Sequence, residues 1–151
     1  MPLEAAARVI LPAALRDSLT RAAEAAHPVE ACGLLVGRRD GAGFIVDAVH
    51  PAVNLLADSR PDRFEIDPRL RIGLQQDLRG SGRDVIGHWH SHPSGLAQPS
   101  PTDAAMAFEG GLLWLILATD PTTGRVCGQG AFRATGRCGA PEAAFLPLEI
   151  V

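Results

Sequence analysis

The chain has 151 residues, which is the length of one ordinary domain and enough to bury a substantial core. Its net charge is −3, and its 14 basic residues are arginines scattered along the chain, so the composition predicts no basic patch and makes nucleic acid a poor partner. The longest apolar run, residues 112–118, is far too short to cross a bilayer, so no membrane role is predicted.

Strands and helices are predicted in alternation along the chain. After the first strand, apolar residues recur at helical spacing and predict a helix. The pair Asp40-Gly41 stands between two apolar runs and predicts an antiparallel hairpin. Asp67, followed by Pro68, predicts the start of a second helix. The predicted strands are residues 7–11, 31–38, 44–53, 64–66, 85–90, 112–118 and 125–134, and the predicted helices are residues 12–26, 68–78 and 101–108.

This order of elements predicts an α/β protein, with a single mixed β-sheet flanked by helices. We expect one domain over residues 1–151, with its core over about residues 7–134. Residues 136–151 are rich in proline and alanine, show no clear periodicity and are expected to form a C-terminal tail that either packs as an edge or stays mobile. No pattern in the sequence determines the oligomeric state.

The three cysteines, Cys32, Cys127 and Cys138, form no Cys-x-x-Cys pair. This spacing favours reduced thiols that pack in the core of a cytoplasmic protein over a disulfide framework. Charged residues interrupt the amino-terminal apolar stretch, so no signal peptide is predicted. Both observations indicate a cytoplasmic location.

The run His90-Ser91-His92-Pro93, followed by Asp103, brings metal-ligand side chains close together in the sequence. On a strand, side chains at positions i and i+2 point to the same face, so His90 and His92 can bind one ion while Ser91 points away. Two imidazoles and a carboxylate suit zinc, and three protein ligands leave the fourth position open for water. The pattern therefore predicts a catalytic zinc site.

Two alternatives remain open at this site. The run from Ser100 to Asp103 is also a helix capping box with Pro101 at the first helical position, and Ser100 can serve in both ways. His88 lies on the same strand face as the other two histidines, so any two of the three imidazoles could act with Asp103.

The chain resembles a known family at these residues. Glu30, His90-Ser91-His92-Pro93, Ser100 and Asp103 together match the motif Glu…His-Ser/Thr-His-Pro…Ser-x-x-Asp of the JAMM (MPN+) metalloproteases. Residues 28–37 are similar to the family's segment around its catalytic glutamate. Residues 63–68 are similar to a segment common in its small prokaryotic members.

The resemblance implies a JAMM/MPN fold of the cytidine-deaminase-like kind and assigns a role to each motif residue. His90, His92 and Asp103 would bind Zn²⁺, Glu30 would act as the acid/base, and Ser100 would assist at the oxyanion. Zinc lowers the pKa of bound water to about 7. Glu30 could then take the proton of that water and pass it to the departing amine.

The resemblance also implies a substrate class. JAMM enzymes typically cut after the Gly-Gly tail of ubiquitin-like proteins, so the expected partner is a ubiquitin-like protein with an extended C-terminal tail. Small stand-alone prokaryotic members act on sulfur-carrier proteins, and a sulfur-carrier adduct is therefore the first expectation. A general deconjugase of ubiquitin-like modifiers is the alternative within hydrolases, and a non-catalytic MPN scaffold is the alternative outside them.

Overall fold

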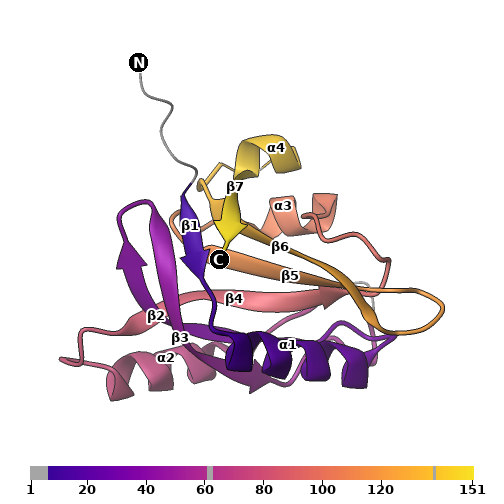
Figure 1. Ribbon diagram of the computed structural model, residues 1–151, viewed down its shortest axis with the longest axis horizontal. Coiled ribbons are helices and arrows are strands. Elements are labelled where there is room, and N and C mark those ends of the chain that lie inside the picture. The colour runs from indigo at the N-terminus through magenta and orange to yellow at the C-terminus, as the bar shows by residue number, and fades with distance from the viewer. Residues whose placement is uncertain (1–6, 61–62, 138) are drawn as a thin grey trace.

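In the described part of the chain, seven strands form one mixed sheet that closes into a barrel in the order β1-β3-β2-β4-β5-β6-β7 (Figure 1). The computed structural model describes residues 7–60, 63–137 and 139–151. The strands are β1 (Arg8–Ile10), β2 (Cys32–Asp40), β3 (Gly43–Ala52), β4 (Asp84–His92), β5 (Leu113–Thr119), β6 (Val126–Ala134) and β7 (Phe145–Ile150). The helices are α1 (Ala13–Ala26), α2 (Pro68–Asp77), α3 (Pro101–Met106) and α4 (Pro141–Ala144). The predicted mixed sheet with flanking helices is confirmed.

The closure of the sheet was not predicted, and it depends on the two ends of the described chain. Strand β1 runs parallel to both of its neighbours, with Val9 opposite Phe44 of β3 and opposite Ile150 of β7. Strand β7 also pairs with β6. The segment expected as a tail, residues 136–151, therefore carries α4 and a strand with a partner on each side.

Two local predictions have opposite outcomes. Asp67 caps α2 as expected, because its Oδ1 accepts a hydrogen bond from the Arg69 amide at 2.9 Å. The strand predicted over residues 64–66 is wrong, because this segment has no strand partner. The backbone of Glu65 instead accepts from the Leu55 amide at 2.9 Å and donates to Asn54 Oδ1 at 3.1 Å. These contacts hold the segment as a loop beside the barrel.

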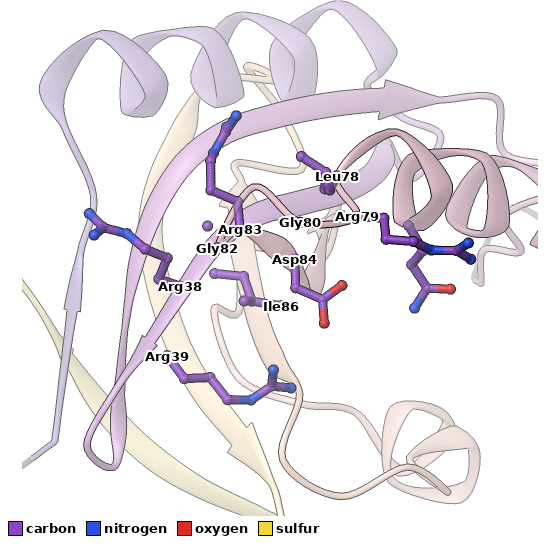
Figure 2. A pocket seen from close by; sticks show the side chains of 11 residues that line it. Arg38, Arg39, Leu78, Arg79, Gly80, Gly82, Arg83, Asp84 and Ile86 are labelled. Carbon is purple, nitrogen blue, oxygen red and sulfur yellow. The ribbon is translucent and has the colours of Figure 1, made fainter.

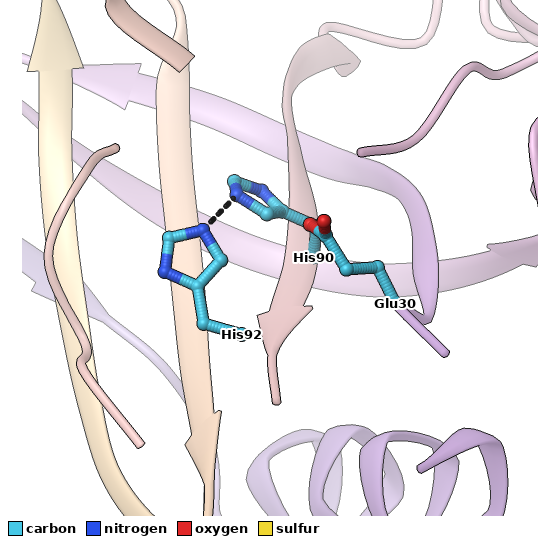
Figure 3. A group of neighbouring side chains, drawn as sticks. All are labelled: Glu30, His90 and His92. Atoms are coloured by element: carbon cyan, nitrogen blue, oxygen red, sulfur yellow. Dashed lines mark hydrogen bonds between the residues drawn. The ribbon is translucent and has the colours of Figure 1, made fainter. Parts of the chain in front are cut away.

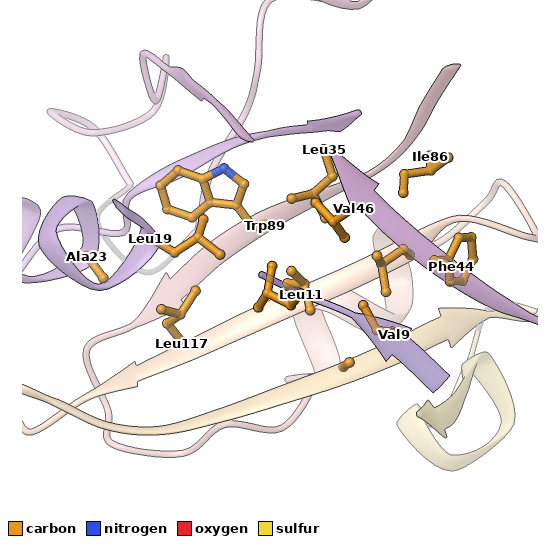
Figure 4. Close-up of a cluster of buried hydrophobic side chains, with 13 residues drawn as sticks. Val9, Leu11, Leu19, Ala23, Leu35, Phe44, Val46, Ile86, Trp89 and Leu117 are labelled. Atoms are coloured by element: carbon orange, nitrogen blue, oxygen red, sulfur yellow. The ribbon is translucent and has the colours of Figure 1, made fainter. Parts of the chain in front are cut away.

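Helices cover both sides of the barrel (Figure 1). The side chains Leu19 and Ala23 of α1 are buried beside Trp89 and Leu117 in the largest apolar cluster (Figure 4). Helix α2 packs on a separate cluster from β2 and β4, and α3 and α4 pack around Trp114 of β5. Burial of a side chain such as Leu19 stabilises the fold by about 1.5–3 kcal/mol, so α1 is firmly fixed to the barrel.

A β-bulge changes the register of β4 before it reaches the histidines. Leu35 of β2 pairs with Gly87, but the next residue, Val36, pairs with Val85, so Ile86 is an extra residue in β4. A Cβ added at Gly87 would lie 1.9 Å from the backbone oxygen of β5, so glycine is required where these two strands approach each other.

The bulge determines which side chains of β4 face the core. Ile86 and Trp89 are three residues apart, yet both belong to the largest apolar cluster. Beyond the bulge the alternation is regular, so His88, His90 and His92 share the opposite face. The prediction that His90 and His92 point to one side is confirmed.

The cysteines differ from one another in burial. Cys32 is buried, as expected, but Cys127 is exposed, so the core prediction is wrong for Cys127. Cys127 lies on the half of β6 that β7 does not pair with, since β7 begins its pairing at Ala131. Cys138 and residues 1–6, to which part of the signal-peptide prediction applies, lie outside the described residues. None of the helices in the described part of the chain has the length and apolar character to cross a membrane.

Candidate metal centre

Strand β4 delivers two imidazoles to one point near its carboxyl end. The Nε2 atoms of His90 and His92 lie 2.9 Å apart, and both rings are buried (Figure 3). The ring of Phe64 stacks on His90, with 4.5 Å between the ring centroids and 25° between the planes. The stacked ring fixes the plane of the His90 imidazole.

Helix α3 adds a carboxylate to the two histidines. Asp103 Oδ2 lies 3.0 Å from His92 Nε2, and Asp103 Oδ1 lies 3.3 Å from His90 Nε2. The predicted capping box is also present, because Ser100 Oγ accepts from the Asp103 amide at 3.0 Å and Asp103 Oδ2 accepts from the Ser100 amide at 2.9 Å. The cap fixes the start of α3 and thereby aims Asp103 at the histidines.

The donor atoms in this cluster suit a cation. Because the backbone oxygen of Leu96 can only accept, its 2.9 Å contact with His92 Nδ1 places a proton there. In the neutral form of the ring, which is the form that binds metal, the Nε2 lone pair then faces His90 and Asp103. Ligand atoms around a tetrahedral zinc ion at about 2.0–2.1 Å stand about 3.3 Å from one another. The separations of 2.9 to 3.3 Å in this cluster are close to that spacing. A bound metal ion would pair every lone pair that converges here.

Electrostatic effects in the cluster keep its carboxylate charged. Burial alone would raise the pKa of Asp103, but hydrogen bonds from His90 and His92 hold it far below its ordinary value. Burial lowers the pKa of His90 and keeps that imidazole neutral, although Asp103 opposes the shift. At His92, burial also acts to lower the pKa, but Asp103 outweighs it and the pKa is raised. A neutral imidazole and an ionised carboxylate are the forms that bind metal.

Glu30 joins this centre from the segment that precedes β2. Its side chain is buried, and its carboxylate and the ring nitrogens of His90 and His92 all lie within 4.8 Å of one another (Figure 3). Glu30 is thus also within reach of a metal ion. The contacts of Asp103 with the two histidines are shorter, at 3.0 and 3.3 Å, so Asp103 completes the tighter set of three.

A cleft of about 580 Å³ borders on the metal centre, and we call it the Glu30 cleft. Glu30, His92 and Ser100 contribute to its wall. The Ser100 oxygen accepts the capping hydrogen bond, and its O–H remains a donor. The cleft therefore brings the Glu30 carboxylate, the His92 imidazole and a hydroxyl donor to one space.

His88 stands apart from the converging atoms. Its ring centroid is 6.1 Å from that of His90, and its ring packs edge-on against Trp114 at 4.2 Å. Burial lowers the pKa of His88 to about 3, so the ring is neutral. Of the three histidines on this face, the structure brings His90 and His92 together with Asp103 and leaves His88 in the neighbouring wall.

Two residues that support the site were missed by the sequence reasoning. Ser91 Oγ accepts from the Ala31 amide at 2.8 Å, which ties the segment carrying Glu30 to β4. Asn54 donates to the backbone oxygens of Glu30 and Arg63, both at 3.1 Å, and accepts from two amides of its own loop. The sequence contained a signal for Ser91, namely its place between the two histidines, but no local pattern marks Asn54.

Four arginines line another hollow at the opposite end of β4. Arg38, Arg39, Arg79 and Arg83 come from β2 and from the segment around the end of α2, so the fold gathers residues that are scattered in sequence. The expectation that the arginines stay scattered and form no basic patch is therefore wrong for these four residues. Arg38 and Arg83 both contact Asp47, at 3.9 and 3.3 Å, and the four guanidinium groups point in different directions (Figure 2). They do not converge on one anion.

The fold and the site together define a zinc-dependent hydrolase of the JAMM type. The family model of the prokaryotic homologues of the JAB domain matches residues 12–129. A desampylase from Haloferax volcanii is 37% identical over 117 residues, which are 75% of this chain and 82% of that protein. The chain belongs to this prokaryotic JAB family.

Solved structures agree with this assignment. A protein from Desulfitobacterium hafniense superimposes with a TM-score of 0.75 at 33% identity, covering 95% of this chain and 91% of that one. A JAB1/MPN domain protein from Archaeoglobus fulgidus shares the fold, with a TM-score of 0.54 at 20% identity and coverage of 97% and 98%. The JAMM/MPN architecture expected from the motif is thus confirmed.

Proposed function

We propose that this chain is a deconjugase that hydrolyses the amide bond after the C-terminal tail of a ubiquitin-like protein. The observation that carries the proposal is the convergence of His90, His92 and Asp103 beside the buried carboxylate of Glu30. In this proposal the first three residues hold zinc, Glu30 is the acid/base and Ser100 is the oxyanion donor. The similarity to a desampylase supports an enzyme of this class.

Zinc bound by His90, His92 and Asp103 would supply a water of pKa about 7 and a Lewis acid for the substrate carbonyl. Glu30 accepts the water proton at its carboxylate as the water oxygen adds to the carbonyl carbon. It then donates this proton to the nitrogen of the departing amine as the C–N bond breaks. This transfer requires the carboxylate to stay in one place through both steps. The hydrogen bonds that hold its backbone, from Asn54 and through Ser91, provide that support.

Ser100 has a separate task. Its O–H is available to donate to the oxygen that becomes negative in the tetrahedral intermediate, while its oxygen continues to cap α3. Removal of such a donor costs about 3 kcal/mol, or roughly 100-fold in rate. A Ser100→Ala variant should therefore be slow and still bind zinc, because Ser100 is not a ligand and its backbone amide still donates to Asp103 Oδ2.

Within this class we favour an adduct of a sulfur-carrier protein as the substrate. This choice rests on the resemblance of residues 28–37 and 63–68 to the small prokaryotic members of the family. General deconjugation of a ubiquitin-like modifier from lysine is the alternative. A non-catalytic scaffold is disfavoured, since Glu30, His90, His92, Ser100 and Asp103 are all present.

The test combines metal content with cleavage followed by mass spectrometry. The zinc-loaded chain is incubated with a ubiquitin-like carrier extended by one residue at its carboxyl terminus, and separately with the same carrier linked to lysine. Glu30→Gln should bind zinc and cut neither, whereas Glu24→Gln, at an exposed position on α1, should match the wild type. Cleavage of the extended carrier but not of the carrier linked to lysine supports a sulfur-carrier adduct as the substrate. Zinc without cleavage of either adduct would reject the deconjugase.

A further inference from the structure

A second hollow, of about 380 Å³, shares Asp103 with the metal centre. Most of its wall surface is apolar, although Arg63, Glu65 and Thr102 also line it, and we call it the apolar pocket. Phe64 and Ile66 come from the loop before α2, His88 and Trp114 from β4 and β5, and Asp103 and Met106 from α3. The mechanism proposed above assigns no role to this pocket.

The apolar pocket lies a short distance along the sheet from the metal centre. His88, in its wall, precedes the ligand His90 by two residues on the same face of β4. Two residues of an extended strand span about 6.6 Å. If the reacting carbonyl of an extended peptide lies at the metal, the side chain of the residue two positions from that carbonyl therefore reaches the pocket.

The chemistry of the Glu30 cleft decides which part of the substrate reaches the pocket. Glu30 and Ser100 line the cleft, and neither lines the apolar pocket. The amine must leave next to the group that protonates it, so the leaving residue belongs over the Glu30 cleft. The acyl part of the substrate, its C-terminal tail, then extends toward the apolar pocket.

We propose that the apolar pocket binds a large apolar side chain of the substrate tail, at the position immediately before two terminal glycines. This inference rests on the proposed function and adds a preference to it. Glycine has no side chain to fill 380 Å³, so the third residue from the scissile bond is the first that can reach in. Because a leucine side chain would be buried there, a tail with leucine at this position should have a kcat/KM about 10-fold or more above that of a tail with alanine.

Met106 is the residue to vary, because it lines the pocket and is 62% exposed, so a polar replacement should be tolerated by the fold. Phe108, two residues further along, is 69% exposed and does not line the pocket, which makes it a matched control. Zinc content and melting temperature should be unchanged in both Met106→Glu and Phe108→Glu.

The experiment uses the zinc-loaded chain and two carriers that differ at one position. One ends in Leu-Gly-Gly and the other in Ala-Gly-Gly, each with one further residue to be removed. We expect the wild type and Phe108→Glu to cut the leucine carrier about 10-fold faster than the alanine carrier. Met106→Glu should cut both carriers at the rate at which the wild type cuts the alanine carrier. Equal rates on the two carriers in the wild type, or a preference that survives in Met106→Glu, would overturn the proposal and leave the deconjugase intact.

A binding measurement separates failure of the pocket from failure of the proposed function. The chain has two methionines, so a methyl-labelled sample gives a simple spectrum in which Met106 is assigned by substitution. A peptide ending in Leu-Gly-Gly should shift the Met106 methyl signal at lower concentration than one ending in Ala-Gly-Gly. If neither carrier is cut, this shift alone supports the pocket, and its absence rejects it.

Discussion

Replacement of Ser91 by alanine tests how the segment that carries Glu30 is held. Ser91 is buried, and its Oγ accepts a 2.8 Å hydrogen bond from the Ala31 amide. In Ser91→Ala that amide loses its acceptor in the protein interior, which costs about 1–3 kcal/mol of unfolding free energy. At about 2–4 °C per kcal/mol for a chain of this size, a cost of about 2 kcal/mol lowers Tm by about 4–8 °C.

The same substitution should slow catalysis without loss of zinc. Ala31 directly follows Glu30, the proposed acid/base, and displacement of such a group by about 1 Å costs roughly 100-fold in rate. Zinc should stay at one per chain, because Ser91 points away from His90 and His92. Calorimetry, metal analysis and carrier cleavage measure the three effects, and Ser91→Thr, which keeps the hydroxyl, is the control. A Ser91→Ala protein that melts and cuts like the wild type would refute the reasoning.

The remaining predictions concern a glycine, a histidine and a thiol. Gly130→Ala would place a Cβ 2.4 Å from a backbone oxygen of the loop that orients His92, a proposed zinc ligand, so zinc affinity should fall about 10-fold. Gly128→Ala, whose Cβ meets nothing closer than 3.6 Å, should leave a competitive chelator titration unchanged. His88→Ala should keep one zinc per chain by metal analysis, and loss of metal would make His88 a ligand. Burial raises the pKa of Cys32 to about 12, so at pH 8 about one thiol in ten thousand is ionised; iodoacetamide should label exposed Cys127, and label on Cys32 in the folded protein would contradict its burial.

The metal centre could be predicted from sequence because its parts are close together in the chain. His90 and His92 stand two apart on a strand, and Asp103 follows in the first turn of the next helix. Alternation and capping, which are both local rules, place these three side chains together. Glu30 is different. An acidic residue before a strand is usually solvated, and only the family motif suggested its position in the buried cluster.

Features that depend on contacts far apart in the chain could not be predicted. The pairing of β1 with β7 joins Val9 to Ile150, and no pattern near either strand indicates it. The loop that carries Phe64 has strand-like composition, yet Asn54, which lies ten residues earlier, takes up the hydrogen bonds of its backbone. The four arginines around the hollow at the far end of β4 likewise meet only in the folded chain.

The closed barrel has a consequence for the order of events during synthesis. Strand β1 is made before all the other strands described, but its neighbour β7 is completed only when Ile150 has been added. Until then, the edges of β1 and β6 that pair with β7 have no partner. The barrel, whose closure joins residues almost a full described chain length apart, cannot close before β7 is present. Such distant pairing slows folding, because the entropy of a long loop must be lost before the contacts form. On the ribosome, the nascent chain therefore carries one unpaired edge on β1 and one on β6 until β7 has been made, and β7 then completes the barrel.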